Sequence, residues 1–152
     1  MIAHHYIRPA RSDDIKRLSA LIRNTLLVSN SADYDPRIIL NLIRQYSTKG
    51  FGRMYSKWNL YLHEIDSSIT GIIGLDGDTI RCFFVAPDRQ GEGIGASLLR
   101  FVENEARYQG IKRLKVGASV TARSFYKKFG YRILSRQPDG EYGKVYLMIK
   151  SI

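Results

Sequence analysis

Residues 85–95 read Val-Ala-Pro-Asp-Arg-Gln-Gly-Glu-Gly-Ile-Gly, which leaves an apolar strand, turns at a proline and enters a helix through three alternating glycines. Side chains at those glycines would keep a phosphate away from the backbone, whereas free N–H groups at a helix start favour bound negative charge. Arg89 adds a charge-assisted contact. The stretch therefore predicts a strand, a pyrophosphate-binding loop and a helix in succession.

The same glycines fit a second kind of phosphate site. Residues 91–96, Gly-Glu-Gly-Ile-Gly-Ala, match the dinucleotide-binding pattern G-x-G-x-x-A. Folds of that type usually place an acidic residue at the end of the next strand, about 20 residues on. The next predicted strand, residues 113–116, contains no acid. A nicotinamide-dependent enzyme is therefore a minor alternative, as is a loop that only serves close helix packing.

Apolar periodicity and turn residues predict the elements on either side of this loop. Helices are expected from Ser12 to about Thr25, from Asp35-Pro36 to just before Gly50, and over residues 93–108 and 121–129. Strands are expected at residues 6–9, 58–65, 68–75, 79–85, 113–116, 131–135 and 144–149, with a turn at residues 138–140. This order calls for a mixed sheet with helices on its faces, an α/β or α+β class, in one domain spanning residues 1–152.

Composition limits the kind of protein. The chain has 152 residues, 44% of them hydrophobic, which is the size of one globular domain. No apolar run approaches the roughly 20 residues that cross a membrane, and residues 1–6 lack the apolar segment of a signal peptide. We therefore expect a cytoplasmic protein. Cys82 is the only cysteine and lies in an apolar strand, so it is expected to be a buried, inert thiol.

The formal charge of +10 indicates an anionic partner, which could be nucleic acid, a membrane surface or a polyphosphate cofactor, and charge alone does not choose among them. The basic excess lies mainly in residues 100–136, where a solvated helix face is the default interpretation, so nucleic acid is an unlikely partner and no membrane contact is expected. His4 and His5 are adjacent but have no partner ligands at metal spacing. No metal site is predicted.

Two motifs together resemble those of the GNAT N-acetyltransferases. Gln90-x-x-Gly93-x-Gly95, preceded by Phe83-Phe84-Val85-Ala86-Pro87, is similar to the family's acetyl-coenzyme A signature, and Ala122-x-x-Phe125-Tyr126-x-x-Phe129-Gly130-Tyr131 resembles its second signature. The resemblance implies a GNAT-like mixed, mostly antiparallel central sheet of about seven strands with helices on both faces. It also implies a sheet splayed between the strands ending at Val85 and near Val116, and acetyl-coenzyme A as the acetyl donor.

The resemblance further implies which residues bind the cofactor. Backbone groups of Phe83, Phe84 and Val85 would hold the pantetheine arm, and N–H groups between Gln90 and Gly95 would hold the pyrophosphate. Many relatives contact the cofactor through an asparagine. At the corresponding position this chain has Ser119, whose hydroxyl would have to make that contact instead. The full predicted set is Phe83, Phe84, Val85, Arg89, Gln90, Gly91, Glu92, Gly93, Ile94, Gly95, Ala96 and Ser119.

Acetyl transfer to an amine needs a neutral amine, a stabilised oxyanion and a proton for the departing thiolate. Tyr126 lies where the family often has a tyrosine near the sulfur, and it is the predicted general acid, although aromatics at this helical spacing are also typical of a core. The family varies its general base. Asp78 is the nearest candidate although a turn role is favoured for it, with His63, Glu64 or a water chain as alternatives. Strand alternation puts His63 and Glu64 on opposite faces, so at most one of them faces a given site.

The acceptor is expected beside the first two helices, their connection at residues 25–35 and the loop at residues 137–143. Tyr34 and Tyr142 are the predicted wall residues. A small amine, a peptide or protein amino terminus and a lysine side chain all remain open, as does a homodimer. The predicted reaction is direct attack of a primary amine in a ternary complex. The alternative is a non-catalytic acyl-coenzyme A binding or regulatory module.

Overall fold

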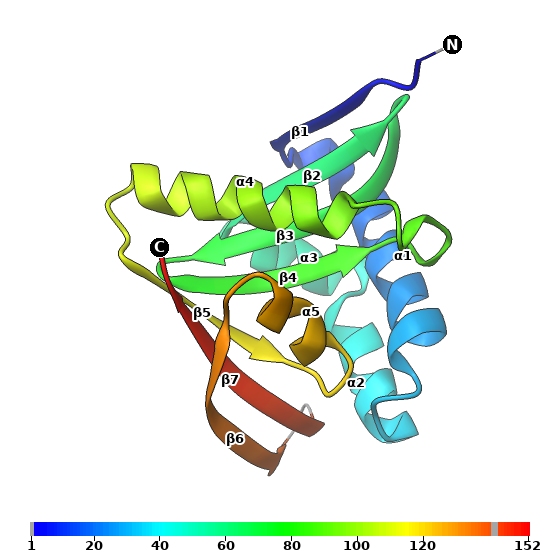
Figure 1. Cartoon of the computed structure of the whole chain (residues 1–152). Helices are drawn as coiled ribbons and strands as arrows, with labels where there is room; N and C mark the ends of the chain where they lie inside the picture. Colours follow the sequence, from blue (N-terminus) through cyan, green and yellow to red (C-terminus); the bar gives the residue numbers. More distant parts are fainter. Residues whose placement is uncertain (1, 141–142) are drawn as a thin grey trace.

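The computed structural model describes residues 2–140 and 143–152, with the backbone alone for residues 138–140 and 143. Its first half holds three helices between the first two strands, and its second half alternates strands with two helices (Figure 1). The elements are β1 (His5–Pro9), α1 (Ile15–Thr25), α2 (Pro36–Gln45), α3 (Thr48–Tyr55), β2 (Asn59–Ile65), β3 (Ser68–Asp76), β4 (Thr79–Val85), α4 (Ile94–Tyr108), β5 (Arg113–Ala118), α5 (Ala122–Lys128), β6 (Arg132–Gly140) and β7 (Gly143–Ser151).

The strands form one seven-stranded sheet in the order β1-β2-β3-β4-β5-β7-β6. All neighbouring strands are antiparallel except β4 and β5, which are parallel. The tight turns after β2 and β3 explain the antiparallel meander, whereas the long crossover through α4 allows β5 to run beside β4 in the same direction. The predicted mixed, mostly antiparallel sheet is confirmed.

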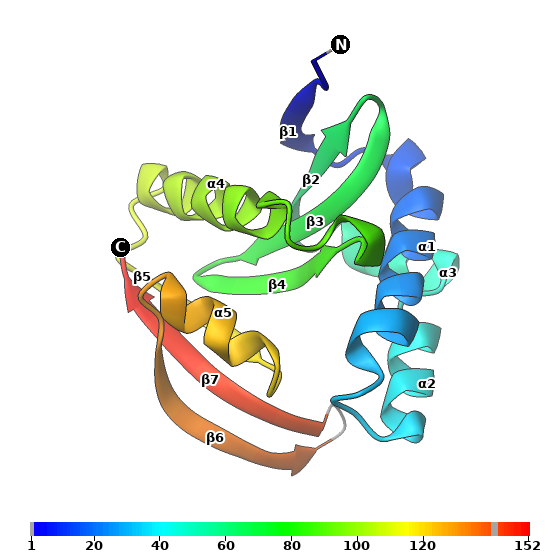
Figure 2. The same cartoon turned by 45° about the vertical axis from the view of Figure 1, so that its right-hand side comes forward.

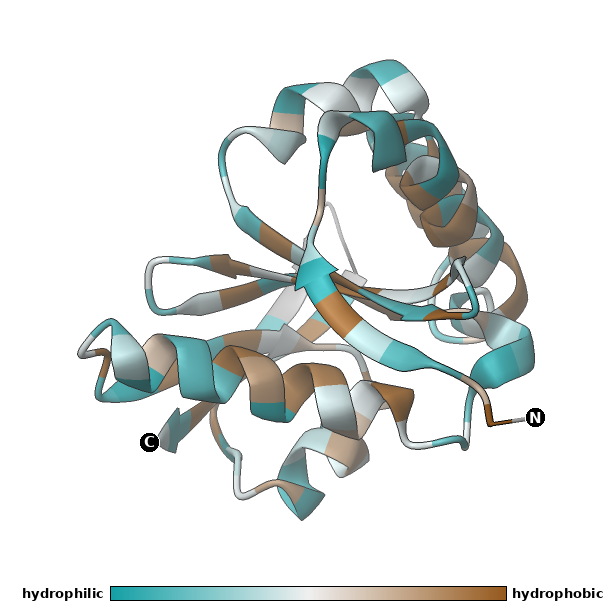
Figure 3. Ribbon diagram, turned by 90° about the horizontal axis from the view of Figure 1, so that it is seen from above, coloured by the Kyte–Doolittle hydropathy of each residue, from teal (hydrophilic) through white to brown (hydrophobic). Residues whose placement is uncertain are grey.

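Helices cover both faces of the sheet, and each face has its own core (Figure 3). On one face α4 and α5 pack on the strands, with Leu98 and Val102 of α4 fully buried. On the other face α1 and α3 pack on the meander through residues that include Leu18, Ile22 and Phe51, all fully buried. The two faces of β4 are therefore reached by two different sets of helices.

The structure differs from the predicted elements in three places. The second helix, predicted to run to just before Gly50, ends at Gln45 instead, and a separate helix, α3, spans residues 48–55 and begins with Ser47 accepting a hydrogen bond from the Gly50 N–H at 3.1 Å. The turn predicted at residues 138–140 is wrong, because β6 continues through Gly140. A π-helical turn, η2 (Leu26–Asn30), also extends α1 past its predicted end. Within the described residues, no helix is both long and apolar enough to span a bilayer.

Candidate active site

β4 and β5 separate soon after they pair. Among the described residues their parallel pairing ends at Ile80 and Val116. Beyond this point β4 contains a bulge, in which Cys82 and Phe83 stand opposite the single residue Ile73 of β3. Cys82 has a φ of 52°, a left-handed conformation that is uncommon outside glycine. The bulge bends β4 and opens the sheet toward the carboxyl ends of β4 and β5 (Figure 2).

The loop after β4 ends in a helix start with free backbone donors. Gly93 is the N-cap of α4 with a φ of 82°, and it has no side chain to cap the first turn. Gly91 has a φ of 83°, which glycine adopts without strain. An uncapped helix start leaves N–H groups unsatisfied and carries partial positive charge. The loop therefore has the geometry of an anion-binding site.

A cavity of about 440 Å³, here called the donor cavity, lies between this helix start, the end of β4 and α5. Arg89 is its only charged lining residue among the described residues. The Gln90 side chain donates to the Val85 carbonyl at 3.2 Å and to the Ser29 hydroxyl at 3.0 Å, which ties the loop to β4 and η2. The predicted cofactor residues that line it are Phe83, Phe84, Val85, Arg89, Gln90, Gly91, Gly93, Ile94, Gly95 and Ala96.

Two predicted cofactor residues lie elsewhere. The Glu92 side chain forms an ion pair with Arg89 at 3.5 Å and does not line the donor cavity. Ser119 lines a smaller cavity of about 180 Å³, here called the central cavity, which shares Phe83, Phe84 and Tyr126 with the donor cavity. The central cavity occupies the opening between β4 and β5, where Ile80 and Val116 form part of its wall.

Among the described residues, four side chains with hydroxyl groups line the central cavity, namely those of Tyr34, Tyr46, Ser119 and Tyr126. Tyr34 precedes α2, and the Ser119 hydroxyl accepts a hydrogen bond from the Ala122 N–H at 3.2 Å. Tyr126 lines the same cavity from α5. The pKa of Tyr126 lies well above its usual value because of burial, with a smaller effect of Tyr34. Tyr126 therefore stays a neutral hydrogen-bond donor throughout the physiological pH range.

Tyr126 is also part of an aromatic cluster. Its ring lies 5.4 Å from that of Phe125, 5.5 Å from that of Tyr131 and 6.2 Å from that of Phe83. Tyr126 is only 5% exposed. It therefore packs in the core, as aromatics at this helical spacing often do, and also lies at the cavity wall. The surrounding rings hold the phenol in one place.

A third cavity of about 860 Å³, here called the acceptor cavity, lies on the α2 and α3 side of β4. It shares Tyr34, Tyr46 and Arg81 with the central cavity. Its wall includes residues 26, 30 and 34 of the predicted acceptor segment, but also the unexpected helix α3. Tyr34 thus lies where an acceptor wall residue was predicted, whereas Tyr142 falls outside the described residues.

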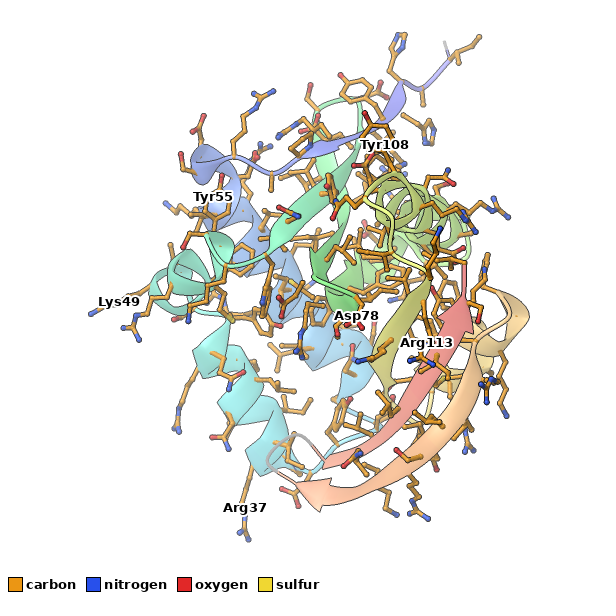
Figure 4. The ribbon with its side chains drawn as sticks, turned by 90° about the vertical axis from the view of Figure 1, so that its left-hand side faces the viewer. Arg37, Lys49, Tyr55, Asp78, Tyr108 and Arg113 are labelled. Carbon is orange, nitrogen blue, oxygen red and sulfur yellow. The ribbon has the colours of Figure 1, made fainter. Side chains whose placement is uncertain are left out.

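The three predicted base candidates lie away from these cavities. Asp78 lies in the turn between β3 and β4, where its carboxylate contacts Lys115 at 3.2 Å (Figure 4). His63 is buried with its Nδ1 at 2.6 Å from the Thr70 hydroxyl, and Glu64 accepts a hydrogen bond from Arg8 at 2.8 Å. None of the three lines the donor, central or acceptor cavity.

Several lining residues could not be predicted from the sequence. Asn30 lines all three cavities, and Arg81 and Tyr46 line the central and acceptor cavities. The basic residues Lys49, Arg53 and Lys57 recur every four positions, a helical signal that Gly50 and Gly52 obscured. Among the described residues no group of three or more His, Cys, Asp or Glu side chains is arranged to hold a metal. Cys82 is buried as predicted, and burial raises the pKa of its thiol to about 12.

Solved structures establish the likeness of the fold. A GCN5-related N-acetyltransferase from Rhodopseudomonas palustris superposes with a TM-score of 0.90 at 22% identity, covering 100% of this chain and 99% of that one. The PaiA N-acetyltransferase from Thermoplasma acidophilum, solved in complex with coenzyme A, has a TM-score of 0.79 at 21% identity, covering 98% of this chain and 99% of that one.

Sequence comparison establishes the family. The uncharacterized N-acetyltransferase YafP of Escherichia coli is 24% identical over 132 residues, which are 86% of this chain and 83% of YafP. The family model of the acetyltransferase (GNAT) domain matches residues 32–147, a stretch that contains β4, the glycine loop, α4 and α5. The predicted family is confirmed, and the chain belongs to the GNAT acetyltransferases, enzymes that use acetyl-coenzyme A.

Proposed function

We propose that this chain transfers an acetyl group from acetyl-coenzyme A to a primary amine by direct attack in a ternary complex, with Tyr126 as the proton donor to the thiolate. The observation that carries the proposal is the central cavity, which shares walls with both the donor and the acceptor cavity. A thioester reaching it from one side meets an amine arriving from the other. No covalent enzyme intermediate is needed in this arrangement.

The donor side is proposed to hold the cofactor in an extended form. The pyrophosphate binds the uncapped N-terminus of α4, where the N–H groups and the helix dipole favour negative charge. The pantetheine arm lies against Phe83 to Val85, whose backbone has left its pairing with β5. The thioester then lies in the central cavity near Tyr126 and Ser119. Coenzyme A bound to the related PaiA enzyme supports this assignment.

In the transfer, negative charge has to be stabilised at two atoms of the thioester, the carbonyl oxygen and the departing sulfur. The amine nitrogen bonds to the thioester carbon, and negative charge develops on the carbonyl oxygen before the carbon–sulfur bond breaks. The bulge leaves Cys82 and Phe83 without a one-to-one partner on β3, so their backbone N–H groups are the proposed donors to that oxygen. The phenol of Tyr126 donates its proton as the thiolate leaves.

Asp78, His63 and Glu64 have no part in the proposed step, because each is held by another group outside the cavities. The cations that line the acceptor cavity lower the pKa of a bound ammonium group and so favour the neutral amine. The proton that the amine loses after attack passes to water, and Tyr126 regains its proton from water. A cytoplasmic location and the absence of a metal stay predictions.

The test compares two buried tyrosines. Tyr126→Phe should lower kcat about a hundredfold, the scale of a lost general acid, while affinity for acetyl-coenzyme A stays within about twofold. The control is Tyr131→Phe, whose ring lies 5.5 Å from that of Tyr126 but whose hydroxyl contacts Glu103 at 3.4 Å, outside the cavities. Unchanged kcat in Tyr126→Phe would remove the proposed acid. Cofactor binding without turnover on any amine would favour a binding module instead.

A further inference from the structure

The acceptor cavity is lined by cations. Arg44, Lys49, Arg53, Lys57 and Arg81 belong to its wall, and no aspartate or glutamate among the described residues does. Tyr34, Tyr46, Gln45 and Ser47 provide polar groups. The cavity volume of about 860 Å³ falls in the range typical of small-molecule sites.

Four of these residues form what we call the cationic cluster, namely Arg44, Arg53, Lys57 and Arg81. They come from the end of α2, from α3 and the turn after it, and from β4, so three separate parts of the chain bring positive charge to one cavity. Lys49 is left out of the cluster because its side chain points away from the fold (Figure 4).

Most of this charge is not neutralised by the protein. Arg81 contacts Asp76 at 3.5 Å, with both side chains nearly half exposed, which is a weak pair. Within the described residues, Arg44, Arg53 and Lys57 form no ion pair. Like charges around one cavity repel, so their gathering favours a ligand of opposite charge.

The cofactor does not account for the cluster. The pyrophosphate loop lies in the wall of the donor cavity, which contains none of these four residues. The acceptor cavity instead meets the central cavity at Arg81, Tyr34 and Tyr46, beside the proposed position of the thioester. Negative charge attracted here would belong to the acceptor.

Resting on the proposed function, we propose that the acceptor is a small amine whose molecule also carries a carboxylate or phosphate group. The acidic group binds the cationic cluster through Arg53 and Lys57, which directs the amine toward Tyr126 and the thioester. Polyamines and other purely cationic amines are disfavoured, because the same charges repel them. The acceptor-binding role falls on positioning residues that do not touch the reacting atoms.

The test uses matched amines with and without the acidic group. Free coenzyme A release from acetyl-coenzyme A is measured with amino acids, their amides, aminoalkyl phosphates, the corresponding amino alcohols, and polyamines. We expect kcat/KM at least about tenfold higher for an acidic amine than for its neutral partner, with the advantage shrinking as salt rises. The carboxylate and phosphate series then show which acidic group is preferred.

Charge-reversal variants locate the effect. Arg53→Glu and Lys57→Glu should each raise KM for the acidic amine about tenfold, leave kcat within about threefold, and leave KM for acetyl-coenzyme A unchanged. The control is Arg37→Glu, the same charge change on α2 at a side chain that points away from the fold (Figure 4). It should leave all three constants near wild type.

The outcomes separate this inference from the proposed function. Equal or better turnover of neutral amines or polyamines, or an unchanged KM in both cluster variants, would overturn the inference and leave acetyl transfer intact. No turnover with any amine would overturn the proposed function, and the inference with it.

Discussion

At Gly95 a methyl group would fit the fold but would project into the donor cavity. A Cβ there would lie 3.5 Å from the Phe125 ring and 3.6 Å from Val85, ordinary contact distances. Gly95 is in the first turn of α4, where alanine is the better helix former. The same methyl group would enter the donor cavity, which Gly95 lines.

We predict that Gly95→Ala keeps or slightly raises the melting temperature, while the Kd for coenzyme A rises about tenfold. Thermal unfolding without ligand and calorimetric titration with coenzyme A measure the two effects separately. An unchanged Kd would mean that the cofactor does not approach this helix start. Loss of folding would instead contradict the contact distances.

The glycine loop could be predicted from sequence because its information is local. Gly91 and Gly93 adopt positive φ, and only a few residue types do so readily. Arg81 and Asn30 could not be predicted, because their position at the cavities depends on a bulge in β4 and a π-helical turn after α1. Neither the bulge nor the π-helical turn is marked by a periodic pattern or a characteristic dipeptide in the sequence.

At the scale of single elements, α3 contains two glycines in different surroundings. A Cβ on Gly50 would lie 2.2 Å from the Gln45 carbonyl oxygen, which is backbone and cannot move cheaply. A Cβ on Gly52 would meet nothing within 4 Å. The first glycine is required by the close passage from α2 to α3, and the second is not.

We expect Gly52→Ala to stabilise the protein by roughly 0.5–1 kcal/mol, because alanine loses less backbone entropy in a helix. Gly50→Ala should destabilise it by more than about 1 kcal/mol through the steric clash. Urea unfolding of the two variants measures both changes in the free energy of unfolding. Equal effects of the two substitutions would contradict the α3 geometry.

These glycines also explain why the sequence pattern does not predict α3. Helix propensity counts Gly50 and Gly52 against a helix, and the packing of Phe51, which is fully buried against α1 and the meander, outweighs that local cost. Strand β6 ran past its predicted turn because pairing with β7 overrides the turn preference of residues 138–140. Helices α1, α4 and α5 and the central strands had no such conflict and were predicted nearly in full, whereas the second helix was predicted to continue past its actual end at Gln45.

At the scale of the whole molecule, a buried ionic cluster joins the first strand to the rest of the fold. Arg8 of β1 donates to both oxygens of Asp14 at 2.8 and 2.9 Å and to Glu64 of β2 at 2.8 Å. Asp14 also accepts from the Arg11 N–H at 2.8 Å and from Arg17 at 3.0 Å. These contacts, the Arg8 hydrogen bonds above all, lower the pKa of Asp14 from 3.8 to about 2.

Because the pKa of Asp14 is lower in the folded state than in the unfolded state, its ionised form stabilises the fold at pH values above the unfolded-state pKa. This stability is lost as the pH falls from about 4 to about 2. The loss attributable to Asp14 is about 2 kcal/mol. Asp14→Asn should remove that part of the pH dependence in denaturant unfolding, whereas Asp13→Asn, at an exposed neighbour, should keep the wild-type slope. Identical slopes in all three proteins would exclude Asp14 as the cause.

The whole fold places two ligands on opposite sides of β4. The donor cavity lies on the α4 and α5 side, the acceptor cavity on the α2 and α3 side, and the central cavity lies where β4 has parted from β5. The sequence motifs belong almost wholly to the donor side. The acceptor side is built from segments without a motif. The donor could therefore be predicted from the sequence, whereas the identity of the acceptor could not.

The central claim is direct transfer of the acetyl group from the cofactor to an amine, and parallel quantification of free coenzyme A and acetylated amine in one reaction tests it most directly. Both products are predicted to rise together in equal amounts, and only when enzyme and amine are both present. Release of coenzyme A without acetylated amine would contradict the claim, because the thioester would then be reacting with water.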